Sequence, residues 1–227
     1  MKSIQLTFLL LFFSFLTFSQ TPCIDGMAGN YPCANIDLQS RLTAEQLLAE
    51  EEGGILLNDI WGWTDPQSGK EYAIVGMANG TSFVDITDPV NPIMLGILPE
   101  HHQASSSGRV MHDGAKSIWR DIKVYNNHAF IVSEDQSHGM QVMDLTRLRD
   151  VTNPPVEFPE DANYQGISNA HNIVINEETG FAYAVGATGT STCGKGGLHI
   201  IDISAPQNPV FAGCFDDEGY THDAQCV

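Results

Sequence analysis

Short runs of apolar and β-branched residues recur along the chain, separated by turns that contain glycine, proline or asparagine. One such run covers residues 71–76, and a second covers residues 80–87 and ends in Asp-Ile-Thr before the Asn-Pro pair at 91–92. Val, Ile, Phe and Tyr in runs of this length favour strands, and proline ends a strand because it has no backbone N–H to donate. The pattern therefore predicts an all-β chain of short antiparallel strands.

This unit occurs three times. The pattern of residues 71–92 returns at 128–154 and at 180–209, and a strand-like run precedes each copy. A further short run follows the Asn-Pro pair, as at 93–98 and 210–215. About four strands repeated every fifty to sixty residues or so are typical of a β-propeller blade, since radial packing covers both faces of each small sheet.

Two polar columns keep the same register across the repeats. Asp59, Asp121, Asn172 and Asp223 form the first column, near the start of each leading run. Asp85, Asp144 and Asp202 form the second column, each before Ile or Leu and then Thr or Ser. Agreement in two independent columns argues against a β-sandwich with coincidental similarity. A turn cap accounts for the second column.

The leading run begins a fourth time at 222–227. Because a propeller closes with about four to eight blades, we expect a β-propeller of four-stranded blades that is incomplete in this chain, the N-terminal part of a longer protein. The expected organisation is a signal peptide at 1–19, an N-terminal extension at 20–54 and propeller repeats at 55–227.

The first residues have the features of a secretory signal. Lys2 precedes an almost wholly apolar run at 4–18, and Thr17 and Ser19 supply small residues for cleavage after Ser19. The run is shorter than the approximately 20 residues of a membrane span, although a retained N-terminal anchor is the alternative. No other stretch is apolar enough to cross a bilayer, so we expect an exported protein, extracellular or on the cell surface, with the outer-membrane surface included.

Five cysteines in an exported chain suggest disulfides. We expect Cys23 to pair with Cys33 in a small loop near the mature N-terminus. Cys193 and Cys214 flank a hairpin-like segment and are expected to pair across it. Cys226 is then left without a partner in this sequence.

Two segments depart from the repeat. Residues 42–52 predict a short helix with Thr43 as N-cap and Gly53 as its stop. Residues 100–116 form a polar insertion within the first repeat, which we interpret as a solvated loop. Its candidate functional residues are His101, His102, His112 and Asp113.

The charge balance narrows the possible partners. The chain has 28 acidic and 10 basic residues and a formal net charge of −18. Such a surface argues against nucleic acid or an anionic lipid surface as partner. It is compatible with Ca²⁺, which prefers oxygen ligands, and equally with solubility alone.

Several stretches resemble a known family. They are residues 58–65, 119–124, 139–142, 170–175 and 220–226. The chain is similar to the exported bacterial proteins with LVIVD repeats, specifically the choice-of-anchor B group. The resemblance implies a secreted or surface β-propeller whose C-terminal anchor differs between species, and it implies no reaction. The later repeats and the anchor of that group are absent from this sequence.

The first polar column carries the strongest candidate chemistry. In a propeller the leading strand of each blade lies nearest the axis, so its repeated side chains converge on one channel mouth. A divalent metal, Ca²⁺ or another, is one candidate ligand there, and the residues proposed to hold it are His171, His222, Asp59, Asp121 and Asp223. Against this, neighbouring strand positions such as His171 and Asn172 point to opposite faces.

The alternative is that these positions hold the blades together. Buried polar groups need hydrogen-bond partners, and structural clamps satisfy them. The residues expected to act in this way are Asn58, Arg120, Asn172, Asp85, Asp144 and Asp202.

Motifs typical of catalysis are missing from the sequence: there is no Gly-x-Ser-x-Gly, no His-Glu-x-x-His, no phosphate loop and no Cys-x-x-Cys. We therefore expect a non-enzymatic binding or scaffold module for a protein or glycan ligand. The alternative is a metal-dependent hydrolase with its site at the channel mouth.

Overall fold

The computed structural model describes residues 20–50, 57–101, 117–189 and 193–227. The predicted signal peptide, the end of the predicted helix at 51–52, and His102, His112 and Asp113 lie outside these residues. The chain divides into two compact units, 1–41 and 42–227.

The first unit is a small disulfide-closed hairpin. Strand β1 (Met27–Ala28) pairs antiparallel with β2 (Tyr31–Pro32), and the Cys23–Cys33 disulfide closes the loop around them. An isolated bridge joins Thr21 to Leu38 on either side of this hairpin.

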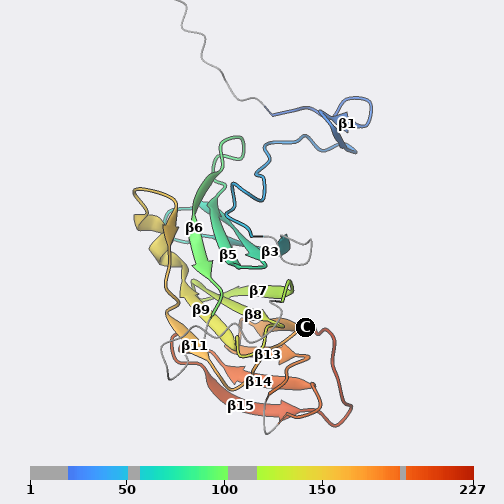
Figure 1. The fold of residues 1–227 in the computed structure, drawn as a ribbon, viewed down its shortest axis with the longest axis vertical. Helices are drawn as coiled ribbons and strands as arrows, with labels where there is room; N and C mark the ends of the chain where they lie inside the picture. The colour runs from blue at the N-terminus through green and yellow to red at the C-terminus, as the bar shows by residue number, and fades with distance from the viewer. Residues whose placement is uncertain (1–19, 51–56, 102–116, 190–192) are drawn as a thin grey trace, which may run out of the picture. The chain divides into compact units, whose positions relative to one another are not determined.

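The second unit begins with a sheet of four consecutive antiparallel strands, blade 1 (Figure 1). Its strands are β3 (Leu57–Thr64), β4 (Glu71–Met77), β5 (Gly80–Asp85) and β6 (Ile93–Pro99). The turns between them fall at the glycine, proline and asparagine clusters of the sequence, as the pattern predicts.

Blade 2 has the same antiparallel order but a longer path to its outer strand. Its strands are β7 (Arg120–Tyr125), β8 (His128–Ser133), β9 (Met140–Asp144) and β11 (Ala162–Tyr164). Between β9 and β11 the chain forms a 3₁₀ helix, η1 (Leu145–Asp150), and the short strand β10 (Val156–Glu157).

Strand β10 crosses to blade 1 and pairs parallel with β6. Gly96 permits this approach, because a Cβ at that position would lie 2.1 Å from the carbonyl oxygen of Val156. Phe158, just after β10, packs edge-on against Phe83 with ring centroids 5.6 Å apart. Blade 2 therefore contributes a fifth strand to blade 1.

Blade 3 is a third antiparallel sheet in chain order. Its strands are β12 (Asn172–Asn176), β13 (Phe181–Val185), β14 (Leu198–Asp202) and β15 (Val210–Phe215). The Cys193–Cys214 disulfide joins the segment before β14 to β15, so both predicted disulfides are present, and Cys226 is free. Three four-stranded antiparallel blades confirm the all-β, propeller-type fold class.

Apolar side chains fill the space between successive blades. Between blades 1 and 2, Ile74 and Phe83 pack with Ile122 and Ile131, all fully buried. Between blades 2 and 3 the same kind of core forms around Phe130, with Ile173, Ala184 and Ile201 among its members. Burial of this surface is the main favourable contribution to folding.

The second polar column caps three equivalent turns. Asp85, Asp144 and Asp202 each accept a hydrogen bond from the backbone N–H two residues later, at 3.0, 2.9 and 2.9 Å. Carboxylates commonly bond their own backbone in this way at turns.

Residues 42–50 cover part of the outer face of blade 1. Leu47 is buried there against Val75, Met77 and Val84. The predicted helix is a single turn in the described residues: the capping bonds between Thr43 and Gln46 are made, but Leu48 has φ of 61°. That left-handed conformation ends the turn. No helix in the described part of the chain has the length and hydropathy of a membrane span.

Candidate ligand pocket at the starts of the inner strands

The leading strands of the three blades, β3, β7 and β12, lie side by side. Because all three begin at the same end, their first residues converge on one pocket of about 250 Å³. Three of the five proposed metal ligands line it, together with all three proposed clamps of the leading strands. The lining residues are Asn58, Asp59, Trp119, Arg120, Asp121, His171 and Asn172.

The carboxylates of this pocket join each blade to the next. Asp59 Oδ2 accepts a hydrogen bond from the backbone N–H of Ile122 at 3.0 Å. One blade further on, Asp121 Oδ2 accepts from the backbone N–H of Ile173 at 2.7 Å. In both cases the donor is the residue that follows the polar column in the next blade, so the contact is a repeated one.

The amide side chains of the pocket make similar contacts. Asn58 Oδ1 accepts from the backbone N–H of Arg120 at 2.9 Å. Asn172 Nδ2 donates to the carbonyl oxygen of His222 at 3.3 Å. Polar side chains of the leading strands thus satisfy backbone groups of β7 and of the segment that contains His222.

The two carboxyl groups of the pocket interact with each other. Burial, then the charge of Asp121 and a hydrogen bond to it, raise the pKa of Asp59 above its usual value. Asp121 Oδ1 accepts a hydrogen bond from Lys123 Nζ at 2.5 Å and another from the backbone N–H of the next residue, Ile122, at 2.9 Å. Asp59 therefore retains a proton to a higher pH than an ordinary aspartate does.

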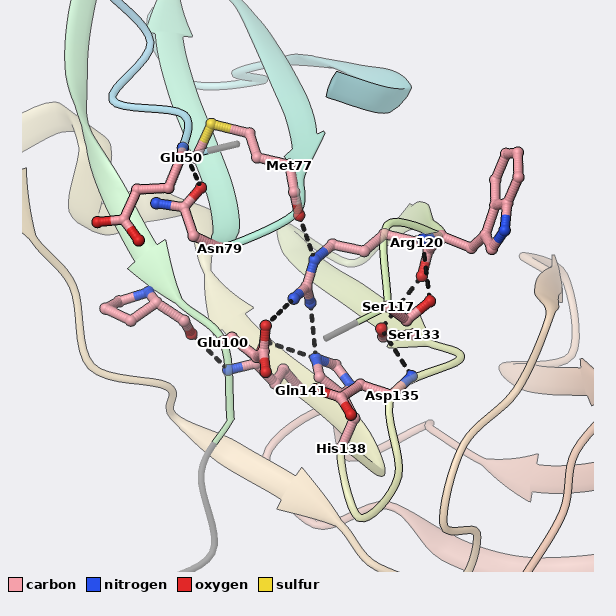
Figure 2. A network of polar contacts seen from close by, with 12 residues as sticks. Glu50, Met77, Asn79, Glu100, Ser117, Arg120, Ser133, Asp135, His138 and Gln141 are labelled. Carbon is pink, nitrogen blue, oxygen red and sulfur yellow. Dashed lines mark hydrogen bonds and ion pairs between the residues drawn. The ribbon is translucent and has the colours of Figure 1, made fainter. Parts of the chain in front are cut away.

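Arg120 lines this pocket, and its guanidinium is fully buried in a polar network (Figure 2). Its Nε donates to the carbonyl oxygen of Met77 at 2.6 Å, and Nη2 donates to Glu100 at 3.0 Å. Its Nη1 lies 2.9 Å from Nε2 of His138. The guanidinium is thus committed to buried partners in blades 1 and 2.

His138 is neutral in this arrangement. Nδ1 lies 3.1 Å from the carbonyl oxygen of Gly139 and so donates to it, which leaves Nε2 to accept from Arg120. Burial, followed by the charge of Arg120, lowers the pKa of His138 to about 3. Protonation would place two like charges together in a buried site.

The same network extends to the outer strand of blade 2. Gln141 donates to the carbonyl oxygen of Pro99 at 3.0 Å and to Glu160 at 3.1 Å. His101 Nδ1 lies 2.7 Å from the Glu160 carboxylate. Burial alone would raise the pKa of Glu160, but hydrogen bonds from His101, Gln141 and Asn163 lower it. The described end of the polar insertion, His101, is therefore held by its contact with the Glu160 carboxylate.

Sequence reasoning missed His138, Glu100 and Gln141. Of these, Gln141 has a detectable signal: it is a polar residue inside a strand-like run, in β9 between apolar neighbours, and is 1% exposed. A buried amide in such a position implies a polar partner across the blade interface.

The remaining proposed metal ligands are only partly brought together. The rings of His171 and His222 lie 4.2 Å apart, and His171 Nδ1 pairs with Glu134. Asp223 accepts from the backbone N–H of Ala224 and does not line the pocket. Across residues 20–50, 57–101, 117–189 and 193–227, no group of three or more His, Cys, Asp or Glu is placed to hold a metal ion.

Comparison with known proteins identifies the repeat. The family model described as the LVIVD repeat matches residues 68–98 and 193–217, which contain strands β4 to β6 and β14 to β15. The two matches lie in blades 1 and 3, and the chain therefore carries LVIVD repeats. No curated protein and no solved structure is detectably similar to the chain.

Proposed function

We propose that this LVIVD-repeat chain is an exported, non-enzymatic binding module whose ligand, a protein or a glycan, occupies the pocket at the starts of the inner strands. The observation that carries the proposal is the convergence of leading-strand side chains from three blades on that one pocket. Polar groups held on a rigid scaffold around a concave site are typical of ligand recognition.

Export is part of the same proposal. The order of a basic residue, an apolar run and small residues at the start of the sequence supports it. Two disulfides support it as well, because they persist in oxidising compartments outside the cytoplasm. We further propose membership of the choice-of-anchor B group and attachment at the cell surface or secretion, and the acidic surface argues against nucleic acid as ligand.

The polar groups of the pocket that catalysis would need already hold structural hydrogen bonds. Asp59 and Asp121 already accept backbone hydrogen bonds from the next blade, and Arg120 is committed to a buried network. A general base or metal ligand needs a lone pair directed at the substrate or ion. The competing function, a metal-dependent hydrolase at this mouth, is favoured only by His171 lying beside this carboxyl pair.

Binding and hydrolysis are separated by testing one preparation of residues 20–227 in two ways. We expect saturable binding on an array of defined glycans and peptides, and loss of that binding in a Trp119→Ala, Asn172→Ala double variant. We also expect no stoichiometric metal and the same melting temperature with Ca²⁺ or EDTA. Metal-dependent turnover of ester or phosphoester probes would overturn the proposal in favour of hydrolysis, and binding that is unaltered in the double variant would place the ligand elsewhere.

A further inference from the structure

The pocket offers both hydrogen-bond donors and hydrogen-bond acceptors that have no partner among the described residues. Within the described residues, Asn58 Nδ2 has no hydrogen-bond acceptor, while Asn58 Oδ1 is bound to Arg120 N. Asn172 Oδ1 has no donor among the same residues, while its Nδ2 donates to His222. His171 holds Glu134 through Nδ1, which leaves Nε2 as a third available atom. A ligand that both donates and accepts hydrogen bonds suits this set.

The charges of the pocket disfavour an ionic ligand. Among the described lining residues the lysine or arginine is Arg120, and its guanidinium is directed to Met77, Glu100 and His138 instead of to an anionic ligand. Asp121 already pairs with Lys123 at 2.5 Å and accepts two backbone N–H groups. The charge of the second carboxyl, Asp59, is disfavoured by burial and by its neighbour. A neutral ligand loses least on entering such a site.

The volume of the pocket and the exposed indole of Trp119 limit the class of ligand further. A volume of about 250 Å³ is below the roughly 300–1,000 Å³ of sites for drug-sized molecules. Trp119 lines the pocket with 46% of its surface exposed, although it lies next to the fully buried Arg120. An indole supplies a large, rigid apolar face beside polar groups. A ring with hydroxyls at its edge and C–H groups on its face matches this combination.

We propose that the pocket binds one ring of a neutral saccharide, with Trp119 against the C–H face and Asn58, His171 and Asn172 on the hydroxyls. The inference rests on the proposed function and specifies its ligand class. Contact with a single small ring gives weak binding, with a dissociation constant on the order of 1 mM for one residue. Several rings along a glycan or several copies of the protein on one surface would raise the apparent affinity.

The test uses residues 20–227 and the methyl glycosides of glucose, galactose, mannose and N-acetylglucosamine as probes. Saturation-transfer NMR reports which glycoside binds, and a titration gives its dissociation constant. We expect one or more glycosides to bind, at least about tenfold weaker binding in Trp119→Ala, and an intermediate value in Trp119→Phe, which keeps a smaller ring. Trp61→Ala is the matched control, because Trp61 is 40% exposed and does not line this pocket; it is expected to bind as the parent does.

Three results would overturn the saccharide inference. They are the absence of transfer to every neutral glycoside, equal binding in Trp119→Ala, and a preference for glucosamine, glucuronate or Ca²⁺ over the neutral probes. Each leaves the binding-module proposal intact as long as the array shows a ligand lost in the Trp119→Ala, Asn172→Ala double variant. If that array also shows no effect of the double variant, both proposals fail. Far-UV circular dichroism of every variant checks that it is folded.

Discussion

Asp121 accepts the backbone N–H of Ile173 at 2.7 Å, so a carboxylate at the start of one blade is bound to the main chain of the next. Ile173 is 1% exposed and belongs to the core between blades 2 and 3. The position of one polar side chain therefore fixes the register of an apolar interface. The contribution of this hydrogen bond to the free energy of unfolding can be measured.

Replacing Asp121 with Ala leaves the buried N–H of Ile173 without an acceptor and Lys123 without its ion pair. We expect the free energy of unfolding to fall by about 2–4 kcal/mol in urea titrations. Asp223→Ala serves as the control, because Asp223 is exposed and its side chain bonds, within the described residues, to the backbone of its neighbour Ala224; a change within about 0.5 kcal/mol is expected. Equal effects of the two substitutions would contradict the role given to Asp121.

Arg120→Met removes a buried cation that donates to the carboxylate of Glu100 and to the carbonyl oxygen of Met77. We expect a loss of about 3–5 kcal/mol, because removing one partner of a buried ion pair is strongly destabilising. Arg147→Met removes an arginine from the partly exposed Arg147–Asp161 pair and is expected to cost at most about 1 kcal/mol. Chemical denaturation of both variants compares them, and similar losses would argue against the buried network.

Stability is expected to fall as the pH drops from about 6.5 toward 5. Burial lowers the pKa of His138 to about 3 and that of His199, whose Nε2 lies 2.8 Å from the Tyr164 hydroxyl, to about 4. Both histidines are neutral in the folded chain and protonated in the unfolded chain over this window. The unfolded state then binds more protons, so stability decreases with falling pH.

The pH effect can be assigned with one substitution. The raised pKa of Asp59 acts in the opposite direction, since a folded state that holds an extra proton gains stability as the pH falls. Between pH 7 and 5, the unfolding free energy of His138→Gln is expected to change less steeply with pH than that of the parent. The difference corresponds to at most one proton fewer taken up on unfolding. An unchanged slope would show that His138 does not titrate as described.

Gly96→Ala tests the fifth strand of blade 1. A Cβ there would lie 2.1 Å from the carbonyl oxygen of Val156, so β10 must move away. We expect a loss of about 1–3 kcal/mol and faster amide hydrogen exchange at residues 156–158. Gly194→Ala is the comparison, because a Cβ at Gly194 meets no atom within 4 Å. Retained protection at 156–158 would mean that β10 tolerates the methyl group.

The blades could be predicted from the sequence because local and long-range signals agree. The strand runs, the turn residues and the two Asp columns mark the same boundaries, and the pocket forms where the first column predicts it. The pathway after Asp144 could not be predicted, because the two-residue strand β10 has no periodicity of its own and pairs with another blade. The predicted helix at 42–52 was wrong over its described part, since tertiary contacts of Leu47 with blade 1 override helix propensity.

Only part of the site could be predicted from the sequence. Asp59 and Asp121 stand at a position that repeats from blade to blade, whereas Glu100 and His138 have no equivalents in the other repeats and so leave no periodic signal. Their partner Arg120 stands at the column-adjacent position that is Asn in blade 1 and His in blade 3. The residue type at this position changes from blade to blade, while the first polar column beside it repeats. Such a change indicates that the interface at this blade differs from the others.

The carboxylate-to-amide bond has a consequence for how such proteins change in length. Blades 1 and 2 each supply a carboxylate acceptor near the start of the leading strand, and blades 2 and 3 each supply, one residue after the column position, the backbone donor for the preceding blade. Duplication of a whole unit that carries this aspartate would therefore recreate the same bond at the new junction. Blade number could then change without a new kind of contact between blades, whereas a duplication that begins in mid-unit would separate donor from acceptor.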